Sequence, residues 1–449
     1  MSLENNFNSI QDKKGIIEIY GLGYVGFPLA IKLSSVGFSV IGIDVNKERI
    51  SRLKRNELQD SEEILKEKFL ECRKEKLELA EQPSKNKIEK IGIICVPTPI
   101  PDENTMSDIF VIKAVKNFLD NAKEGDCLIL ESSVEVGTTE KVQKLIENKG
   151  FSIGINFGLS FCPERIDPSN KEWGIENIPR IIYSSDDLTF KISKEVYNSV
   201  NGGNLIRVEH PKIAEVVKSF ENAFRLVNIS LVNELAILCD NLGINVKSVI
   251  DAASTKPFGF LPHYPGAGAG GHCIPKDPRF LLESAKKFQE NFATIENALN
   301  INRKMPKYIS NSVENLINKL GLKKIILVAG LSYKSNVEDM RDSASFKVIN
   351  ELVSSGFEVF GYDPFFKAEI IKKYLIENDL SEINFKLVDN LNGEILEKIS
   401  CICIVQHHDI TFEELNEVYK KSKVPLIYDC QNKIKRDSNS KTILDCLGN

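Results

Sequence analysis

The chain lacks the features that mark zinc-binding, membrane-spanning, secreted and nucleic-acid-binding proteins. Its ten cysteines contain no Cys-x-x-Cys pair and its five histidines no His-x-x-x-His pair, so the common zinc-site spacings are absent. No apolar run reaches the roughly 20 residues that a membrane span requires, and residues 1–14 are too polar for a secretory signal. The formal net charge of −5 gives no electrostatic reason to bind nucleic acid. We therefore expect a cytoplasmic protein with reduced thiols, no bound metal, and no membrane or nucleic-acid partner.

The length of 449 residues and the order of the predicted elements indicate three domains. Short apolar strands alternate with helices over residues 1–205, and the pattern returns over residues 306–449. The intervening residues 206–305 are helical and rich in loops. We predict an α/β fold in which two Rossmann-like, doubly wound domains are joined by a helical central domain.

A dinucleotide-binding signature opens the first domain. It comprises a strand over residues 16–20, Gly21, Gly23 and Gly26, a helix over residues 27–36, and a strand over residues 39–43 that ends at Asp44. Gly21 permits a tight turn, Gly23 lets the backbone approach a pyrophosphate, and Gly26 lets the helix pack on the strand. Asp44 can accept hydrogen bonds from ribose hydroxyls, and no arginine follows it directly, so NAD is favoured over NADP. The competing interpretation is an α/β turn that binds no ligand. The second α/β half lacks this spacing, so we expect it to bind something other than a dinucleotide.

A glycine-rich loop in the middle of the chain presents one cysteine. Residues 264–278 read YPGAGAGGHCIPKDP, which places Cys273 after four glycines and before a lysine and an aspartate. Nearby positive charge favours the thiolate form of such a cysteine. Either hydride transfer to NAD proceeds with Cys273 as a bystander, or Cys273 forms a thiohemiacetal that is oxidised to a thioester and hydrolysed. The covalent route also needs a cation for the oxyanion and a base for water, for which Lys218 and Glu164 are candidates.

Several of these side chains also have ordinary structural interpretations. The other nine cysteines are expected to be buried as small hydrophobic residues. Lys218 shares one face of a helix predicted over residues 211–242 with Asn222, and a lysine on a helix is ordinarily solvated. Asp277 can cap the helix that follows it. Glu164 and the adjacent arginine can form a surface ion pair.

Two further stretches are interpreted from composition alone. Residues 46–90 are highly charged and are predicted to be mostly helical. The pair His407–His408 resembles a metal-binding pair but lacks cysteine or carboxylate partners at ligand spacing. We therefore predict that the two histidines are polar loop residues.

Taken together, the motifs resemble the UDP-glucose/GDP-mannose dehydrogenase family over nearly the whole chain. They are GLGYVG at 21–26, VPTP at 96–99, PER at 163–165, Lys218 with Asn222, GGHCIPKD at 270–277, GLSYK at 330–334, RDS at 341–343 and GYDP at 361–364. This family oxidises the C-6 alcohol of a nucleotide sugar to a carboxylate with two NAD and water. The resemblance implies an NAD-dependent oxidoreductase whose C-terminal domain binds the uridine half of a UDP-sugar. It also implies a homodimer or higher homo-oligomer formed through the middle helices.

The resemblance assigns roles to individual residues. Cys273 is the implied nucleophile, Lys218 and Asn222 hold an ordered water or the oxyanion, Asp277 acts with that water as base, and Glu164 assists thioester hydrolysis. The implied cofactor-binding residues are Gly21, Gly23, Tyr24, Val25, Gly26, Asp44, Arg49, Pro97, Thr98, Ser133 and Thr138. The implied substrate-binding residues are Glu164, Arg165, Lys218, Asn222, Tyr264, Gly270, His272, Lys334 and Arg341.

The identity of the residue before Cys273, His272, narrows the range of expected substrates. UDP-glucose dehydrogenases usually have serine there, whereas the Gly-Gly-His272-Cys sequence is similar to the branch that acts on N-acetylhexosamine sugars. UDP-N-acetylglucosamine is therefore favoured and UDP-N-acetylmannosamine is next, for synthesis of capsule or another surface polysaccharide. The alternatives are a UDP-glucose 6-dehydrogenase and a non-catalytic module that senses NAD and nucleotide sugars. The chain departs from the family pattern at Ser169, Ala267, Ala344 and Gln431.

Overall fold

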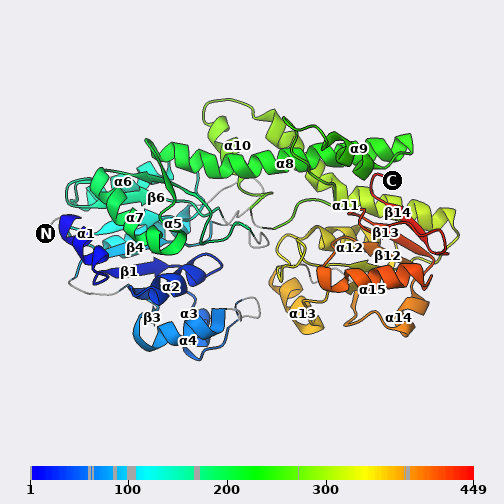
Figure 1. Ribbon diagram of the computed structural model, residues 1–449, viewed down its shortest axis with the longest axis horizontal. Coiled ribbons are helices and arrows are strands. Elements are labelled where there is room, and N and C mark those ends of the chain that lie inside the picture. The colour runs from blue at the N-terminus through cyan, green and yellow to red at the C-terminus, as the bar shows by residue number, and fades with distance from the viewer. Residues whose placement is uncertain are drawn as a thin grey trace. The chain divides into compact units, whose positions relative to one another are not determined.

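The protein divides into two compact units, each built around one sheet. The computed structural model describes residues 3–58, 62, 65–83, 88–98, 108–165, 172–271, 273–378, 380 and 385–449. The first unit comprises Met1–Glu221 with Arg279–Asn291, and the second comprises Asn222–Pro278 with Phe292–Asn449. Figure 1 shows the sheet of each unit with its helices.

The sheet of the first unit has the strand order β3-β2-β1-β4-β5-β6-β7-β8. Its pairs are parallel except for β6 with β7. The strand order reverses between β1 and β4, which is where α/β sheets bind ligands beyond the carboxyl ends of their strands. The elements of this part are α1 (Leu3–Gln11), β1 (Ile16–Tyr20), α2 (Gly26–Ser35), β2 (Ser39–Ile43), α3 (Lys47–Lys54), α4 (Lys66–Glu75), β3 (Leu77–Ala80), β4 (Lys90–Ile94), α5 (Ile109–Leu119), β5 (Cys127–Leu130), α6 (Thr138–Asn148), β6 (Gly158–Phe161), β7 (Arg180–Ser184), α7 (Asp187–Asn201) and β8 (Leu205–Val208).

The central strands of this sheet are buried on both faces. All residues of β1, β4, β5 and β6 are buried, as near-continuous apolar runs in parallel sheets require. The side chains of β1 contribute to two apolar clusters. Ile17 and Ile19 pack in one cluster, and Ile16 and Tyr20 pack in the other. The helices cover both faces of the sheet, which confirms the doubly wound pattern.

The sheet of the second unit is parallel and has the strand order β11-β10-β9-β12-β13-β14. Helical segments from the middle of the sequence contribute Ala236, Ile250 and Ile309 to one of its two cores. The remaining elements are α8 (Pro211–Leu242), α9 (Val246–Ala253), α10 (Pro278–Lys286), α11 (Ala293–Lys319), β9 (Ile325–Ala329), α12 (Ala344–Ser354), β10 (Glu358–Tyr362), α13 (Ala368–Glu377), β11 (Lys386–Leu387), α14 (Gly393–Lys398), β12 (Cys401–Ile404), α15 (Asp409–Lys420), β13 (Leu426–Asp429) and β14 (Ile443–Cys446).

The helix α8 has the bounds that its sequence predicts. It begins at Pro211 and ends before Gly243, whose φ of +67° is the left-handed conformation that stops a helix. Among the described residues, α8 is long and apolar enough to cross a membrane. This is weak evidence for a membrane span, because core helices pass the same test. In α8, 44% of the apolar window is buried within the protein. Its exposed apolar side chains include Leu231, Leu238 and Leu242. The predicted dimer interface and the predicted lack of a membrane partner both stay predictions.

The two sheets contain the same glycine turn at equivalent places. Gly21 follows β1 with φ +94° and Gly330 follows β9 with φ +83°. Each donates its N–H, at 2.8 Å, to the carbonyl that ends the neighbouring strand, β2 or β10. In each turn the next N–H donates to an aspartate after that strand, Leu22 to Asp44 and Leu331 to Asp363. The sequences GLGYVG and GLSYKS therefore occupy equivalent turns, with Ser332 in the place of the glycine that a pyrophosphate approaches.

The predicted fold class is confirmed, and a few local predictions are wrong. The segment predicted as mostly helical contains the edge strand β3, which is four residues long and alternates buried and exposed positions. The sequence analysis also missed α1, β7, β8 and β14. His407 and His408 lie in the loop between β12 and α15, as predicted, but they are buried there, with 2% and 1% of their surface exposed.

Candidate active site

Two of the three signature glycines are required by the fold, and the third faces open space. A Cβ on Gly21 would lie 2.7 Å from the carbonyl oxygen of Cys95, and one on Gly26 would lie 2.0 Å from the carbonyl oxygen of Gly21. A Cβ on Gly23 would meet no atom within 4 Å. The turn thus leaves a backbone-lined space at the N-terminus of α2, where exposed N–H groups favour phosphate. This space fits the pyrophosphate of NAD.

Asp44 and Arg49 hold the Leu22 peptide from its two sides. The carboxylate of Asp44 accepts hydrogen bonds from the N–H groups of Leu22 at 2.8 Å and Asn46 at 2.9 Å. The guanidinium of Arg49 donates to the carbonyl of Leu22 at 3.1 and 3.2 Å and to the carboxylate of Glu62 at 2.5 and 2.9 Å. Arg49 therefore braces the turn, and its direct contact with the cofactor stays a prediction.

The residues predicted on the nicotinamide side follow β4 and β5. Thr98 is 4% exposed, and Thr138, fully buried, donates from its hydroxyl to Asp108 at 3.4 Å. Next to the predicted Ser133, the hydroxyl of Ser132 donates to the carbonyls of Ile94 and Val96, which ties the two strand ends together.

The sequence analysis missed a buried carboxylate at the start of α6. Glu215, on α8, accepts hydrogen bonds from the N–H groups of Gly137 at 2.6 Å and Thr139 at 2.8 Å, and from the Thr139 hydroxyl at 2.6 Å. A carboxylate is favoured there by the helix dipole of α6. Lys218 lies three residues later on the same helix, so Glu215 fixes the helical turn that carries it.

We expect Gly23→Ala to weaken NAD binding about tenfold and to change the free energy of unfolding by less than about 1 kcal/mol. The added methyl group enters the space left for the pyrophosphate and touches no protein atom. Gly26→Ala is the matched control, because its methyl group collides with the Gly21 carbonyl and should cost about 2–3 kcal/mol of stability. Calorimetric titration with NAD and urea unfolding measure both variants. Unchanged NAD affinity in Gly23→Ala contradicts the assignment.

Cys273 is the only exposed cysteine of the ten, all of which lie in the described part of the chain. Its carbonyl accepts the N–H groups of Lys276 at 3.1 Å and Asp277 at 2.8 Å, so the thiol stands on a tight turn before α10. A Cβ on the preceding Gly270 would lie 2.5 Å from the carbonyl oxygen of Asp342. A Cβ on Gly271 would lie 2.6 Å from the ring of Tyr333. The two glycines are therefore required by close packing on the segment after β9.

The charge of Cys273 acts on the pKa of two cations, which therefore interact electrostatically with this residue. The first is Lys276, which the sequence analysis did not select. Burial lowers the pKa of Lys276, and negative charge at Asp277 and Cys273 partly offsets that effect. The second is Arg341, whose guanidinium pairs with Asp339 at 2.6 Å.

Asn222 and Asp277 are joined directly beneath the Cys273 turn. The side-chain amide of Asn222 donates to the carboxylate of Asp277 at 2.7 Å, and the two residues are 5% and 2% exposed. The Asp277 carboxylate is thus held by a side chain of α8, a contact that the helix-cap interpretation did not include. The structure brings Cys273, Asn222 and Asp277 together within the second unit. Lys218 and Glu164 belong to the first unit, so their place beside the thiol stays a prediction.

Glu164 forms an ion pair with the buried Arg180. The surface ion pair with Arg165 that the sequence suggested is not formed between these two described residues. Its carboxylate accepts a hydrogen bond from Arg180, which is fully buried and also donates to Glu131 at 2.8 Å. The hydroxyl of Tyr197 donates to the same Glu131 oxygen at 2.5 Å. Burial raises the pKa of Glu131, and the charge of Arg180 partly offsets this effect. Arg165 instead pairs with Glu221.

The remaining predicted substrate residues lie in the second unit, apart from His272, which is outside the described residues. The hydroxyl of Tyr264 donates to Asp251 at 2.9 Å, and Lys334 follows Tyr333 in the turn after β9. Asn302 holds the glycine-rich loop, because its side chain accepts the Ala269 N–H at 2.6 Å and donates to the Ala269 carbonyl at 2.9 Å.

The two adjacent histidines are structural partners of aspartates. His407 Nε2 lies 2.9 Å from Asp429 Oδ1, and His408 Nε2 lies 3.2 Å from Asp363 Oδ2. Burial alone raises the pKa of each aspartate, but the facing imidazole and backbone N–H groups hold it below its ordinary value. Within the described residues, no three histidine, cysteine or acidic side chains gather as a metal site.

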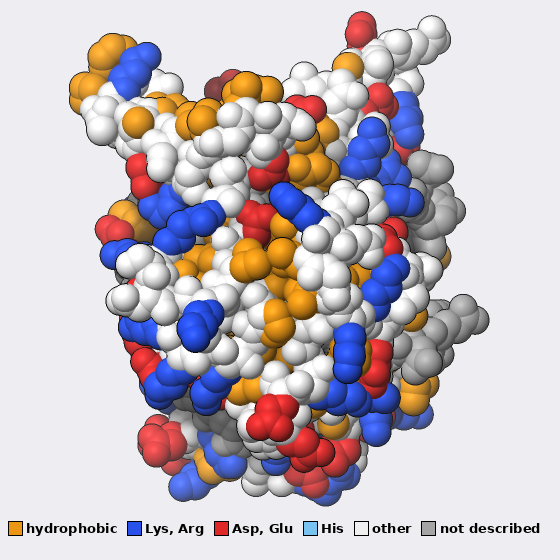
Figure 2. Space-filling view, turned by 90° about the vertical axis from the view of Figure 1, so that its right-hand side faces the viewer, with side chains coloured by type: hydrophobic (Ala, Val, Ile, Leu, Met, Phe, Trp, Pro, Cys, Tyr) orange, Lys and Arg blue, Asp and Glu red, His pale blue; other side chains and the backbone are white. Residues whose placement is uncertain are grey.

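Charges are mixed on the face drawn in Figure 2. Lysine and arginine side chains are interspersed there with aspartate and glutamate, and hydrophobic side chains gather near the centre. The described residues of this face therefore form no continuous basic stripe of the kind that binds a phosphate backbone.

Three models of one family match the chain in order. The NAD binding domain of the UDP-glucose/GDP-mannose dehydrogenase family matches residues 16–201, its central domain matches residues 212–304, and its UDP binding domain matches residues 327–436. The three matches bear out the NAD cofactor and the UDP-sugar substrate predicted from the motifs.

Individual relatives agree with the family models. The chain is 32% identical over 425 residues to the UDP-N-acetyl-D-mannosamine dehydrogenase of Methanococcus vannielii, covering 92% of each chain. It is 33% identical over 362 residues to the UDP-N-acetyl-D-glucosamine 6-dehydrogenase of Salmonella typhi, covering 80% of this chain and 84% of the other. The solved structure of the UDP-D-ManNAc dehydrogenase from Pyrococcus horikoshii matches with a TM-score of 0.82 at 29% identity, covering 96% of this chain and 99% of that one. This chain therefore belongs to the UDP-glucose/GDP-mannose dehydrogenase family and is an NAD-dependent nucleotide-sugar dehydrogenase.

Proposed function

We propose that the protein oxidises the C-6 alcohol of a UDP-N-acetylhexosamine to the carboxylate through a covalent intermediate on Cys273. The observation that carries the proposal is an exposed thiol that interacts electrostatically with Lys276 and Arg341, on a turn that also holds the Asn222–Asp277 pair. A thiolate of this kind serves a covalent route, whereas simple hydride transfer has no use for it.

The reaction consists of two oxidations separated by the addition of sulfur. The alcohol first loses a hydride and a proton to become an aldehyde. The Cys273 thiolate then adds to the carbonyl carbon, and the resulting thiohemiacetal loses a second hydride to become a thioester. Water attacks the thioester, the C–S bond breaks, and the thiolate and the carboxylate are released. NAD, when bound, accepts each hydride, so one sugar consumes two NAD and one water.

The protein's own side chains stabilise charge and move protons in this sequence. Lys276 and Arg341 favour the thiolate before it attacks. Lys218 and Asn222 stabilise the oxyanion or hold the water, and Asp277 receives a proton through that water. Glu164, held by Arg180, assists attack of water on the thioester.

For the sugar, we place UDP-N-acetylmannosamine first and UDP-N-acetylglucosamine second, which reverses the order favoured by the sequence motifs. The Methanococcus vannielii and Pyrococcus horikoshii relatives, which align with more than nine tenths of the chain, are named for the mannosamine sugar. A uronic acid of this class is a building block of surface polysaccharide, which is the pathway that we propose.

An NADH absorbance assay across four nucleotide sugars tests the proposal. We expect UDP-N-acetylmannosamine and UDP-N-acetylglucosamine to be oxidised at least tenfold more efficiently than UDP-glucose and GDP-mannose, with two NADH formed per sugar. Faster oxidation of UDP-glucose favours the UDP-glucose 6-dehydrogenase alternative. Binding of NAD and UDP with no NADH from any sugar favours the sensing module.

A further inference from the structure

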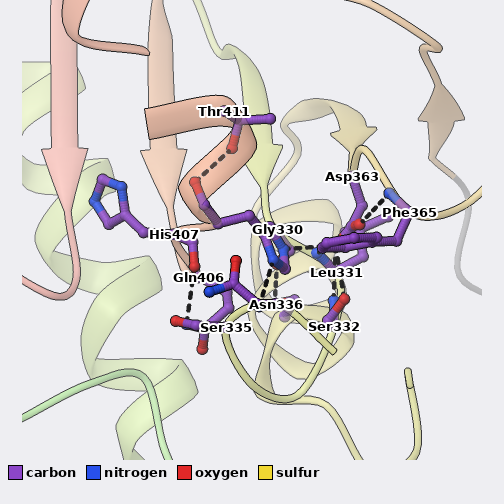
Figure 3. A network of polar contacts seen from close by, with 12 residues as sticks. Gly330, Leu331, Ser332, Ser335, Asn336, Asp363, Phe365, Gln406, His407 and Thr411 are labelled. Carbon is purple, nitrogen blue, oxygen red and sulfur yellow. Dashed lines mark hydrogen bonds and ion pairs between the residues drawn. The ribbon is translucent and has the colours of Figure 1, made fainter. Parts of the chain in front are cut away.

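The turn of residues 330–336, which contains Lys334, is fixed at its first end by one buried carboxylate. Asp363 is 4% exposed and accepts hydrogen bonds from the N–H of Leu331 at 2.7 Å and from the N–H and hydroxyl of Ser332 at 2.9 and 3.0 Å. Figure 3 shows Asp363 beside Leu331 and Ser332 at the carboxyl ends of the strands. The same carboxylate also accepts the N–H of Phe365 at 2.9 Å and faces the ring of His408.

His408 fixes the far end of the same turn. Its Nδ1 accepts the N–H of Asn336 at 3.0 Å while its Nε2 faces Asp363. An accepting Nδ1 and a carboxylate at Nε2 define the neutral ring with its proton on Nε2. Asn336 has a φ of +58°, a conformation uncommon outside glycine, and its side-chain oxygen accepts the N–H of Asp409 at 2.8 Å. The imidazole therefore spans the turn from Asn336 to Asp363.

The fixed turn contacts the loop that carries the thiol. Tyr333 packs so closely on Gly271 that a Cβ there would lie 2.6 Å from its ring, and the Tyr333 N–H donates to the carbonyl of Asp339 at 2.9 Å. Gly271 in turn donates its N–H to the carbonyl of Arg341 at 3.0 Å. Lys334 follows Tyr333 directly in the sequence. The hydrogen bonds of Asp363 and His408 that fix the turn therefore also fix the backbone of Lys334 beside the Cys273 loop.

We propose that His408 is a positioning residue for nucleotide-sugar binding. By joining Asn336 to Asp363, it holds Tyr333 and Lys334 in the conformation that receives the sugar nucleotide. This inference rests on the proposed function of the site. Without the ring, the N–H of Asn336 loses its protein acceptor, and this end of the turn is no longer tied to Asp363. The effect falls on nucleotide-sugar affinity and leaves NAD binding, which belongs to the other sheet, unchanged.

Two substitutions separate the two contacts of the ring. In His408→Gln the side-chain amide nitrogen keeps the donor that faces Asp363, but the acceptor for Asn336 is lost. In His408→Asn the side-chain oxygen keeps the acceptor for Asn336, but the donor is lost. His407→Gln is the matched control, since His407 is equally buried and its glutamine replacement keeps a donor toward Asp429.

We expect His408→Gln to raise the KM for the nucleotide sugar and the Kd for UDP about tenfold, with kcat and the KM for NAD within twofold of the wild type. His408→Asn is expected to raise the same two constants about threefold, and His407→Gln to leave them within twofold. Titration calorimetry with UDP measures the affinity without turnover.

Three outcomes overturn the inference. They are unchanged UDP affinity in His408→Gln, an equal loss of NAD affinity in that variant, and an equal loss of UDP affinity in His407→Gln. If His408→Gln does not fold, His408→Asn decides the matter, and unchanged UDP affinity in it overturns the inference. A wild-type protein that oxidises no nucleotide sugar refutes the proposed function instead, and UDP binding then still tests His408.

Discussion

Cys273→Ser is expected to lower formation of the uronic acid by at least about 10³-fold while NAD and UDP bind with affinities within twofold of the wild type. A serine hydroxyl stays protonated at neutral pH, and Lys276 and Arg341 cannot ionise it as they can a thiol. The first hydride transfer does not use the sulfur, so the variant still forms the aldehyde. Chromatography of the products and the ratio of NADH to sugar measure the result, with a ratio of two expected for the wild type.

Cys72→Ser is the matched control for that experiment. Cys72 is buried on α4, and its thiol lies 3.6 Å from the carbonyl of Ile31, a contact that a serine hydroxyl can keep. We expect full acid formation from this variant. Acid formation by Cys273→Ser at the wild-type rate contradicts the covalent route and restores the interpretation in which Cys273 is a bystander.

The parts of the fold and of the site that could be predicted are those marked by residues close together in the sequence. The glycine spacing, Asp44 after β2, and the proline and glycine that bound α8 all act over a few residues. The Cys273 loop is readable for the same reason, because its glycines, lysine and aspartate are contiguous. Such signals depend on backbone conformation, which neighbouring residues determine.

The parts that were missed depend on partners far apart in the sequence. Arg180 meets Glu131 across 49 residues, and His408 meets Asp363 across 45. No periodicity or spacing relates such pairs, since the sheet order alone brings them together. The histidines were therefore taken for polar loop residues, although His407 is buried against Asp429 at the end of β13 and His408 against Asp363 after β10.

The repeated glycine turn shows how one local structure serves two binding tasks. In the first sheet the space beside Gly23 is open, and Asp44 keeps few contacts. In the second sheet Ser332 stands at the position equivalent to Gly23. Its hydroxyl and the ring of His408 both contact the carboxylate of Asp363. The second turn thus has no open glycine position like that of Gly23, and it is braced as a support for the residues that follow it. That difference explains why only the first half carries the dinucleotide signature.

Arg180→Met is expected to destabilise the protein by about 3–5 kcal/mol, because it leaves Glu131 buried without a cation. Arg180 and Glu131 are both fully enclosed, and the Tyr197 hydroxyl and Cys95 thiol also donate to Glu131. Urea unfolding measures the loss. Arg207→Met on the adjacent strand β8 is the control, since Arg207 pairs with Asp187 at the surface and should change stability by less than about 1 kcal/mol.

The double variant Arg180→Met with Glu131→Leu separates charge from packing at this site. Removing both buried charges together is often close to neutral, so the double variant should recover at least half of the stability lost by Arg180→Met. It should not recover acid formation, because Glu164 still lacks the guanidinium that holds its carboxylate. A double variant as unstable as the single one contradicts the electrostatic account. One that is stable and fully active shows that Glu164 does not depend on Arg180.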